Sequence, residues 1–194
     1  RRPAERPPTI DVEIESAITQ IADDGITYRG HDVARLAVDA GFEQVAELLW
    51  SGALPTSRPT WSVDRRALER CRRVVAAAGP VDPSAALALA AAVLSTEPAD
   101  RSDDAARRLL AVVPDLLGAR RRSGPLALRL ASAWDLRPSD ELVTAIDRAL
   151  VLLADHELAT STLGVRVAAS VRADAGVALA AGLQTVRGPL HGEA

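Results

Sequence analysis

The spacing of apolar residues changes once along the chain, close to its start. Apolar and polar residues alternate through residues 10–21 and again through residues 25–30, and Asp24-Gly25 between them is a strong signal for a tight turn. This pattern predicts a β-hairpin, the only sheet that the sequence indicates. From Asp32 onward apolar residues recur every three or four positions, which predicts helices.

Gly and Pro residues divide the part of the chain with helical periodicity into separate helices. Residues 33–37 carry the apolar face of a first short helix, and residues 42–50 carry a second that ends at Gly52. A later helix contains Pro114, which lacks a backbone donor and is expected to bend it. The remaining predicted helices span residues 60–78, 84–94, 103–118, 126–134, 139–154, 161–172 and 175–186.

The composition favours one helical domain. Hydrophobic residues make up 48% of the chain and aromatic residues only 3%, which suits helices packed closely through small side chains. A length of 194 residues is enough for one core without a disulfide or metal staple. We expect residues 1–9, with three prolines, to form a poorly ordered linker, and residues 10–194 to form one mainly α-helical domain.

Charge and cysteine content argue against several classes of function. The formal net charge is −3 and the pI is near 5.7, so nothing electrostatic favours binding to nucleic acid or to an anionic membrane. The longest apolar run, residues 85–94, is far shorter than the roughly 20 residues that span a bilayer. Cys71 is the single cysteine, so no internal disulfide can form, and we expect a cytoplasmic protein. The absence of lysine excludes a Walker phosphate loop and a lysine Schiff base.

Each of the three histidines has a structural as well as a functional interpretation. His31 precedes Asp32, a good helix cap, so we favour a surface position at the junction of hairpin and helix. His156 begins HELAT, which lacks the second histidine of a zinc-protease helix, so no metal site is expected. His156 and His191 both lie at element boundaries, where side chains can converge on a cleft. A histidine at either position alone is more often structural.

Two further features have a structural explanation. Residues 120–122 are all arginine and, with Arg107 and Arg108, suggest a basic patch. Acidic residues surround them and aromatic residues for stacking are lacking, so we expect a solvated helix end. Cys71 is expected to pack against neighbouring helices.

Three stretches, in this order, resemble the citrate synthase family: ITYRGHDVARLA with VAELLWSGALP near the start, LLADHELATSTLGVRVAAS in the middle, and GLQTVRGPLHGEA at the end. The pairing of ADHE with GPLHG is specific. The resemblance runs from about Ile10 to Ala194 and corresponds to roughly the first half of a family member. It implies the multi-helical large domain of that family with a small N-terminal β-hairpin, incomplete at its C-terminus.

The resemblance assigns roles to two histidines. His191 matches the catalytic histidine that hydrogen-bonds the thioester carbonyl of acetyl-CoA and stabilises the enol, and His156 matches the histidine that contacts oxaloacetate. A neutral imidazole suits the first role, and we expect a helix that begins just after Pro189 to disfavour the charged form. The family's second catalytic histidine, its aspartate base and its substrate-binding arginines are expected beyond Ala194.

Two positions depart from the family pattern. Many relatives carry Asn where this chain has Ala159, so a polar group near the substrate is missing. Glu193 places a negative charge where the family usually has a small or apolar residue, close to an anionic thioester substrate. Neither departure rules out catalysis.

The resemblance therefore implies an enzyme of the tricarboxylic acid cycle that joins acetyl-CoA to oxaloacetate by Claisen condensation and thioester hydrolysis, giving citrate and CoA. Acetyl-CoA is then a co-substrate, with no cofactor and no metal, and the enzyme is expected to be a homodimer. One alternative is a non-catalytic relative that binds an acyl-CoA or a dicarboxylate as a regulatory module. In that case the proline-rich start would suit a linker to a DNA-binding domain. A second alternative is a 2-methylcitrate synthase, whose thioester substrate differs from acetyl-CoA only in the length of its acyl chain.

Overall fold

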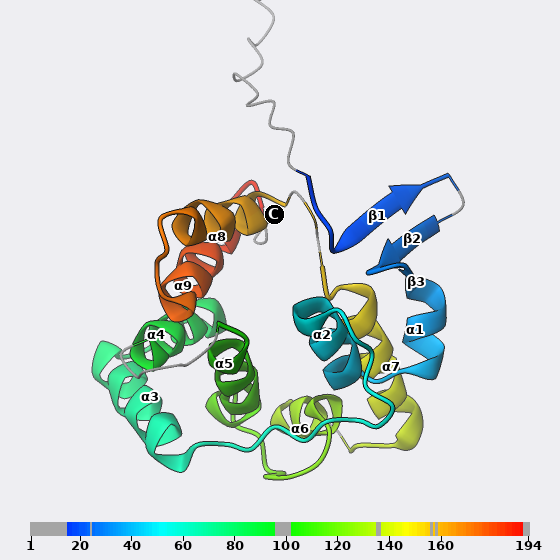
Figure 1. Ribbon diagram of the computed structural model, residues 1–194. Helices are drawn as coiled ribbons and strands as arrows, with labels where there is room; N and C mark the ends of the chain where they lie inside the picture. The colour runs from blue at the N-terminus through cyan, green and yellow to red at the C-terminus, as the bar shows by residue number, and fades with distance from the viewer. Residues whose placement is uncertain are drawn as a thin grey trace, which may run out of the picture.

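The computed structural model describes residues 15–23, 25–95, 102–134, 137–155, 157 and 159–191 (Figure 1). This part of the chain contains nine helices and one three-stranded sheet, so the predicted mainly α class is confirmed. In chain order the elements are β1 (Thr19–Ala22), β2 (Gly25–Tyr28), β3 (His31–Asp32), α1 (Val33–Asp39), α2 (Phe42–Ser51), α3 (Arg65–Ala78), α4 (Pro83–Leu94), α5 (Ser102–Leu116), α6 (Leu126–Ala133), α7 (Asp140–Leu152), α8 (Thr160–Ser170) and α9 (Ala175–Val186).

The predicted hairpin is confirmed, with a shorter first strand. β1 and β2 pair antiparallel with Ala22 opposite Gly25. The sequence did not indicate β3, which joins the sheet because Arg29 and Gly30 turn the chain back with positive φ angles of 51° and 83°. Residues 10–14, which the pattern placed in the first strand, lie outside the described residues.

A first hydrophobic cluster holds the sheet and α1, α2, α6 and α7 together. Its centre is formed by Tyr28, Val45, Leu48 and Val151, none more than 1% exposed. In Figure 1 these helices form one group beside the strands. The cluster therefore fixes the end of α7 against the hairpin.

A second cluster packs α3, α4, α5 and α9 through small side chains. Cys71 is fully buried in it, as predicted. Gly176, at the start of α9, lies so close to α4 that a Cβ atom there would stand 2.5 Å from the carbonyl oxygen of Ala91. A Cβ atom added at Gly182 would likewise lie too close to the side chain of Val165 in α8. Small residues thus let these helices approach, as the composition suggested.

One helix begins later than the apolar period predicts. The pattern indicated residues 60–78, but α3 starts after Asp64, whose carboxylate accepts two backbone amides at 2.9 and 3.2 Å. The preceding residues instead place Trp61 against Trp50, with ring centroids 5.6 Å apart. The helix start is therefore determined by the cap and by an aromatic contact that the period does not reveal.

Two helices begin after residues whose own side chains cannot cap them, Gly41 before α2 and Pro125 before α6. The first amide of α2 donates to Asp147 of α7 over 3.1 Å, and the first amide of α6 donates to Glu43 of α2 over 2.6 Å. Arg58 pairs with both carboxylates. Side chains from distant helices therefore satisfy these helix starts.

The arginine run is a solvated surface, as predicted. Residues 120–122 are exposed, and Arg122 pairs with Asp115 over 3.1 Å. Arg107 pairs instead with Glu47 of α2, over 2.5 Å.

Among the described helices none combines the length and the hydrophobicity needed to cross a bilayer. The described residues also contain no group of three or more His, Cys, Asp or Glu residues that could hold a metal ion.

Candidate functional site

His191 lies on the turn that follows α9. Its amide donates to the carbonyl oxygen of Gly188 over 2.9 Å, and the residue is half-buried. The ring nitrogen Nε2 lies 3.3 Å from the backbone nitrogen of Ser161 and 3.0 Å from Ser161 Oγ. Figure 1 shows this end of the chain beside the start of α8. The predicted catalytic histidine therefore lies at a helix N-terminus.

The contact with Ser161 determines which ring nitrogen of His191 can donate. A backbone amide can only donate, so Nε2 accepts here and the proton of the neutral ring lies on Nδ1. An imidazolium would offer this amide no acceptor. The helix that presents its positive end to the ring is α8, whereas the sequence had suggested one that begins after Pro189. Residues 189–191 form a turn.

α8 is the third described helix in which a backbone amide of the first turn donates to a side chain from a distant part of the chain. Its N-cap residue is Ala159, which has no side-chain acceptor. The ring of His191 accepts one of the amides in the first turn in its place. The contact is therefore structural as well as chemical: it holds α8 and directs the ring.

The hairpin holds the segment between α7 and α8. Thr19 Oγ1 donates to Asp155 Oδ2 over 2.5 Å, and the Asp155 amide donates to the Tyr28 hydroxyl over 3.3 Å. The same hydroxyl lies 3.2 Å from the carbonyl oxygen of Leu152, to which it donates. Asp155 Oδ1 accepts the amide of Glu157 over 3.3 Å. Asp155 is therefore bonded both to the hairpin and to Glu157, on the other side of position 156.

The burial of Tyr28 affects its acidity. The residue is 1% exposed, and this burial raises the pKa of its phenol above the ordinary value of 10.0. The hydrogen bond with Asp155 opposes part of that rise. The phenol therefore keeps the proton that it donates to α7.

His156 lies outside the described residues, as do Gly192 and Glu193. Its contact with oxaloacetate and a site shared with His191 therefore stay predictions. His31 is exposed on β3, opposite Tyr28, which confirms the surface position that the sequence favoured.

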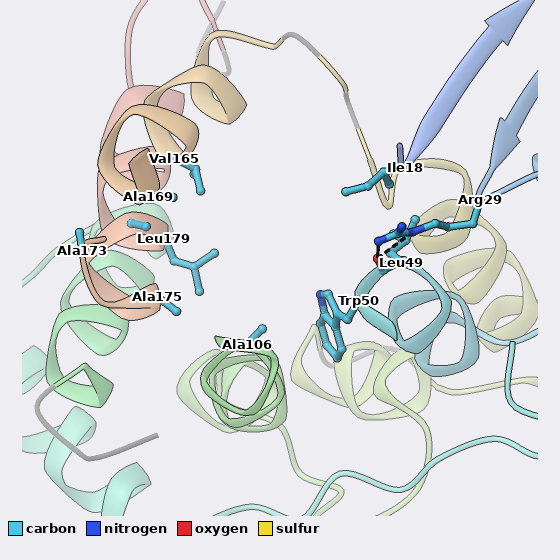
Figure 2. A pocket seen from close by; sticks show the side chains of 11 residues that line it. Ile18, Arg29, Leu49, Trp50, Ala106, Val165, Ala169, Ala173, Ala175 and Leu179 are labelled. Atoms are coloured by element: carbon cyan, nitrogen blue, oxygen red, sulfur yellow. Dashed lines mark hydrogen bonds between the residues drawn. The ribbon is translucent and has the colours of Figure 1, made fainter. Parts of the chain in front are cut away.

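A groove of about 660 Å³ lies between α8 and α9 on one side and α2 on the other (Figure 2). Every residue that lines it except Arg29 is apolar, and Trp50 stands across from Leu179. The guanidinium of Arg29 is occupied by the carbonyl oxygen of Leu49, 2.8 Å from Nη2 and 3.3 Å from Nε. The described lining of this groove therefore offers no acid, base or nucleophile.

Sequence reasoning missed Ser161, Tyr28, Thr19 and Asp155. Tyr28 carried a signal, because it is the single tyrosine and stands at an alternating strand position that can face inward. The others carried none, since their partners lie 30 to 136 residues away in the chain.

Comparison with known proteins identifies relatives along nearly the whole chain. The family model described as "Citrate synthase, C-terminal domain" matches residues 11–194. A 2-methylcitrate synthase of Mycobacterium tuberculosis is 32% identical over 197 residues, which cover 87% of this chain and 49% of the relative. A citrate synthase of Mycolicibacterium smegmatis is 31% identical over 195 residues, covering 87% and 52%. The chain thus spans about half the length of these curated relatives.

The fold also occurs in a solved structure. The citrate synthase of the thermophilic archaeon Thermoplasma acidophilum, in a ternary complex with carboxymethyl coenzyme A and oxaloacetate, matches 94% of this chain and 56% of its own with a TM-score of 0.74. The two sequences are 23% identical, so this likeness concerns the fold alone. Because the family model covers nearly the full length as well, this chain belongs to the citrate synthase family.

Proposed function

We propose that the full-length protein containing this chain is an acyltransferase of the tricarboxylic acid cycle that condenses acetyl-CoA with oxaloacetate to give citrate and CoA. The observation that carries the proposal is the position of the His191 ring, with Nε2 on the Ser161 amide and Nδ1 left as a donor. Relatives named citrate synthase support it. A structural neighbour bound to carboxymethyl coenzyme A and oxaloacetate supports the same pair of substrates.

The proposed chemistry needs a fixed neutral donor. When a base removes a proton from the methyl carbon of acetyl-CoA, negative charge develops on the thioester oxygen, and a donor such as His191 Nδ1–H stabilises it. The enol carbon then attacks the keto carbon of oxaloacetate, and the resulting alkoxide takes a proton. Water cleaves the thioester and releases the CoA thiol. His156 would donate to a carboxylate or keto oxygen of oxaloacetate, and by family resemblance the base lies beyond Ala194.

Propionyl-CoA, the acyl donor implied by the name 2-methylcitrate synthase, is the competing substrate. It differs from acetyl-CoA by one methylene, which a pocket discriminates by about 1–3 kcal/mol. Relative kcat/KM values for the two thioesters therefore decide between the two reactions. We also propose a homodimer, as the family resemblance implies, and a cytoplasmic location, which the single cysteine favours.

The test is the release of CoA thiol by the purified full-length protein. We expect release that requires both acetyl-CoA and oxaloacetate, with citrate as the product. Isothermal titration with each substrate accompanies the assay. Binding of either ligand without thiol release would contradict the enzymatic function and support the non-catalytic, ligand-binding alternative.

A further inference from the structure

A cavity of about 590 Å³ lies between α3 and the segment that follows α5. Its charged lining consists of three arginines, Arg65, Arg72 and Arg122, and two carboxylates, Glu69 and Asp115. The groove in Figure 2, by contrast, is lined almost entirely by apolar side chains. The cavity is therefore suited to a charged ligand, and its lining does not include His191.

Three guanidinium groups meet at the single carboxylate of Asp115, whose side chain is 2% exposed. Arg129, itself buried, donates to Oδ2 over 2.5 Å. On the other oxygen, Oδ1, Arg122 Nη1 donates over 3.1 Å and Arg72 Nη2 lies 3.9 Å away. Since Arg129 alone balances the charge of this carboxylate, the cations of Arg72 and Arg122 are in excess where they face the cavity.

The guanidinium groups of Arg72 and Arg122 use few of their hydrogen-bond donors. Each guanidinium carries five N–H groups. Within the described part of the chain, Arg72 donates only to the carbonyl oxygen of Asp115, over 3.3 Å, and Arg122 donates only to Asp115 Oδ1. The two side chains are 41% and 66% exposed. Most of their donors are therefore accessible to a ligand in the cavity.

Arg65 adds a third cation from the start of α3. It is the first residue of this helix, two turns before Arg72, and so lies on the same helix face. Among the described residues it has no ion-pair partner. The first turn of α3 contains no acidic residue, and the helix macrodipole disfavours a cation there. An anion bound between Arg65 and Arg72 would offset this repulsion.

We propose that this cavity binds the phosphate group of a small molecule through Arg65, Arg72 and Arg122. A phosphate monoester carries a charge of about −1.5 to −2, which matches the two cations that Asp115 leaves unbalanced. Its oxygens accept paired N–H donors from arginine. A carboxylate group brings one charge, which Asp115 already supplies. The formal net charge of the chain is −3, so binding depends on this local arrangement and not on a general attraction for anions.

The chain provides matched controls beside two of the three arginines. Arg73 follows Arg72 and Arg121 precedes Arg122; both are exposed, and neither lines the cavity. Replacing either by Gln removes the same charge one residue away from the proposed site. A diffuse electrostatic attraction would therefore weaken equally in the control and in the test variant.

Two further variants test the sign of the effect. Arg65→Gln removes a cation that has no ion pair among the described residues, so it leaves the packing of α3 intact. Glu69→Gln removes an exposed carboxylate that lines the cavity and opposes an anion. The two substitutions should change the affinity in opposite directions.

The experiment titrates pyrophosphate into the full-length protein by calorimetry, with CoA at saturation so that the phosphate groups of the proposed substrate occupy their own site. We expect the Kd to rise about 10- to 100-fold in Arg72→Gln and in Arg122→Gln, because each loses charge-assisted hydrogen bonds. Arg65→Gln should raise the Kd about 10-fold, and Glu69→Gln should lower it about two- to five-fold. Arg73→Gln and Arg121→Gln should stay within about two-fold of wild type. Thermal melts establish that each variant is folded.

Absence of pyrophosphate binding by the wild-type protein overturns the proposal, and so does an equal loss in Arg72→Gln and Arg73→Gln. If Arg72→Gln and Arg122→Gln do not fold, opposite shifts in Arg65→Gln and Glu69→Gln support the site, and shifts in one direction overturn it. Citrate that competes with a lower Kd than pyrophosphate would overturn the assignment to phosphate. None of these outcomes depends on thiol release, so this proposal and the proposed function can fail separately.

Discussion

His191 and Ser161 are 30 residues apart in the sequence and in contact in the fold, with His191 Nε2 3.0 Å from Ser161 Oγ and 3.3 Å from the Ser161 backbone nitrogen. The contact joins the turn after α9 to the first turn of α8. It requires Nε2 to act as an acceptor, which places the proton of the neutral ring on Nδ1. The proposed catalytic role depends on this arrangement.

The tautomer of His191 can be observed directly. Nitrogen-15 NMR of the neutral imidazoles should show His191 with a protonated Nδ1 and an unprotonated Nε2, because the Ser161 amide can only donate. Ser161→Ala keeps that amide and should keep the tautomer. A His191 ring protonated mainly on Nε2 in the wild-type chain would show that the contact is absent in solution.

Replacing Ala159 by Asn should stabilise the protein. Ala159 is the N-cap of α8 with an extended backbone (φ −54°, ψ 142°), and an Asn side chain there could accept a first-turn amide. We expect the free energy of unfolding to rise by about 1 kcal/mol in denaturant titration. Ala169→Asn, within the same helix, should instead lower it by about 0.5 kcal/mol. If Ala159→Asn lowered the free energy of unfolding as much as Ala169→Asn, the Asn side chain would add no cap, and His191 would already satisfy the start of α8.

Tyr28 should titrate late and affect stability in alkali. Burial raises the pKa of its phenol above 10.0, so its contribution to stability is complete below about pH 10 and is lost as the pH rises through the folded-state pKa. The stability of wild type should therefore fall toward that of Tyr28→Phe above pH 10. Phenolate absorbance reports this group alone, because the chain has one tyrosine. A midpoint at or below 10.0 in the folded chain would contradict the buried position.

Gly176→Ala should destabilise the contact between α4 and α9. The added Cβ would stand 2.5 Å from the Ala91 carbonyl oxygen and 2.7 Å from Ser95 Cβ, and the backbone atom cannot rotate away. We expect a loss of about 1–3 kcal/mol in unfolding free energy. Gly164→Ala is the control, because its nearest neighbour is the Thr185 hydroxyl at 3.0 Å, on a side chain that can rotate. A neutral Gly176→Ala would mean that the helices lie farther apart.

Local pattern was sufficient to predict most of the fold. The bounds of α9 agree with the predicted residues 175–186, and α1, α2, α4 and α6 begin within one residue of the predicted start. The errors arose where a side-chain contact or a local turn determined the outcome. Trp61 packs on Trp50 and delays α3, and Arg29 with Gly30 turns the chain into β3. Neither effect appears in hydrophobic periodicity.

The candidate site was predicted only in part. The histidines were proposed from their positions at element boundaries and from the family resemblance, but the groups that bond to His191 or to the neighbours of His156 were not identified. Ser161 was expected only as the first residue of a helix, and Asp155 only as the residue that follows one. Their partners, His191 and Tyr28, come from distant parts of the chain, so only the fold could reveal them.

The most direct test of the account is the rate of CoA thiol release by His191→Ala in the full-length protein, with acetyl-CoA and oxaloacetate saturating. If His191 Nδ1–H stabilises the developing enolate, kcat should fall about 10²- to 10³-fold, while His31→Ala, at an exposed position, should stay within about two-fold of wild type. A thermal melt separates this loss from the weaker capping of α8. Equal rates in the two variants, both folded, would contradict the role assigned to His191.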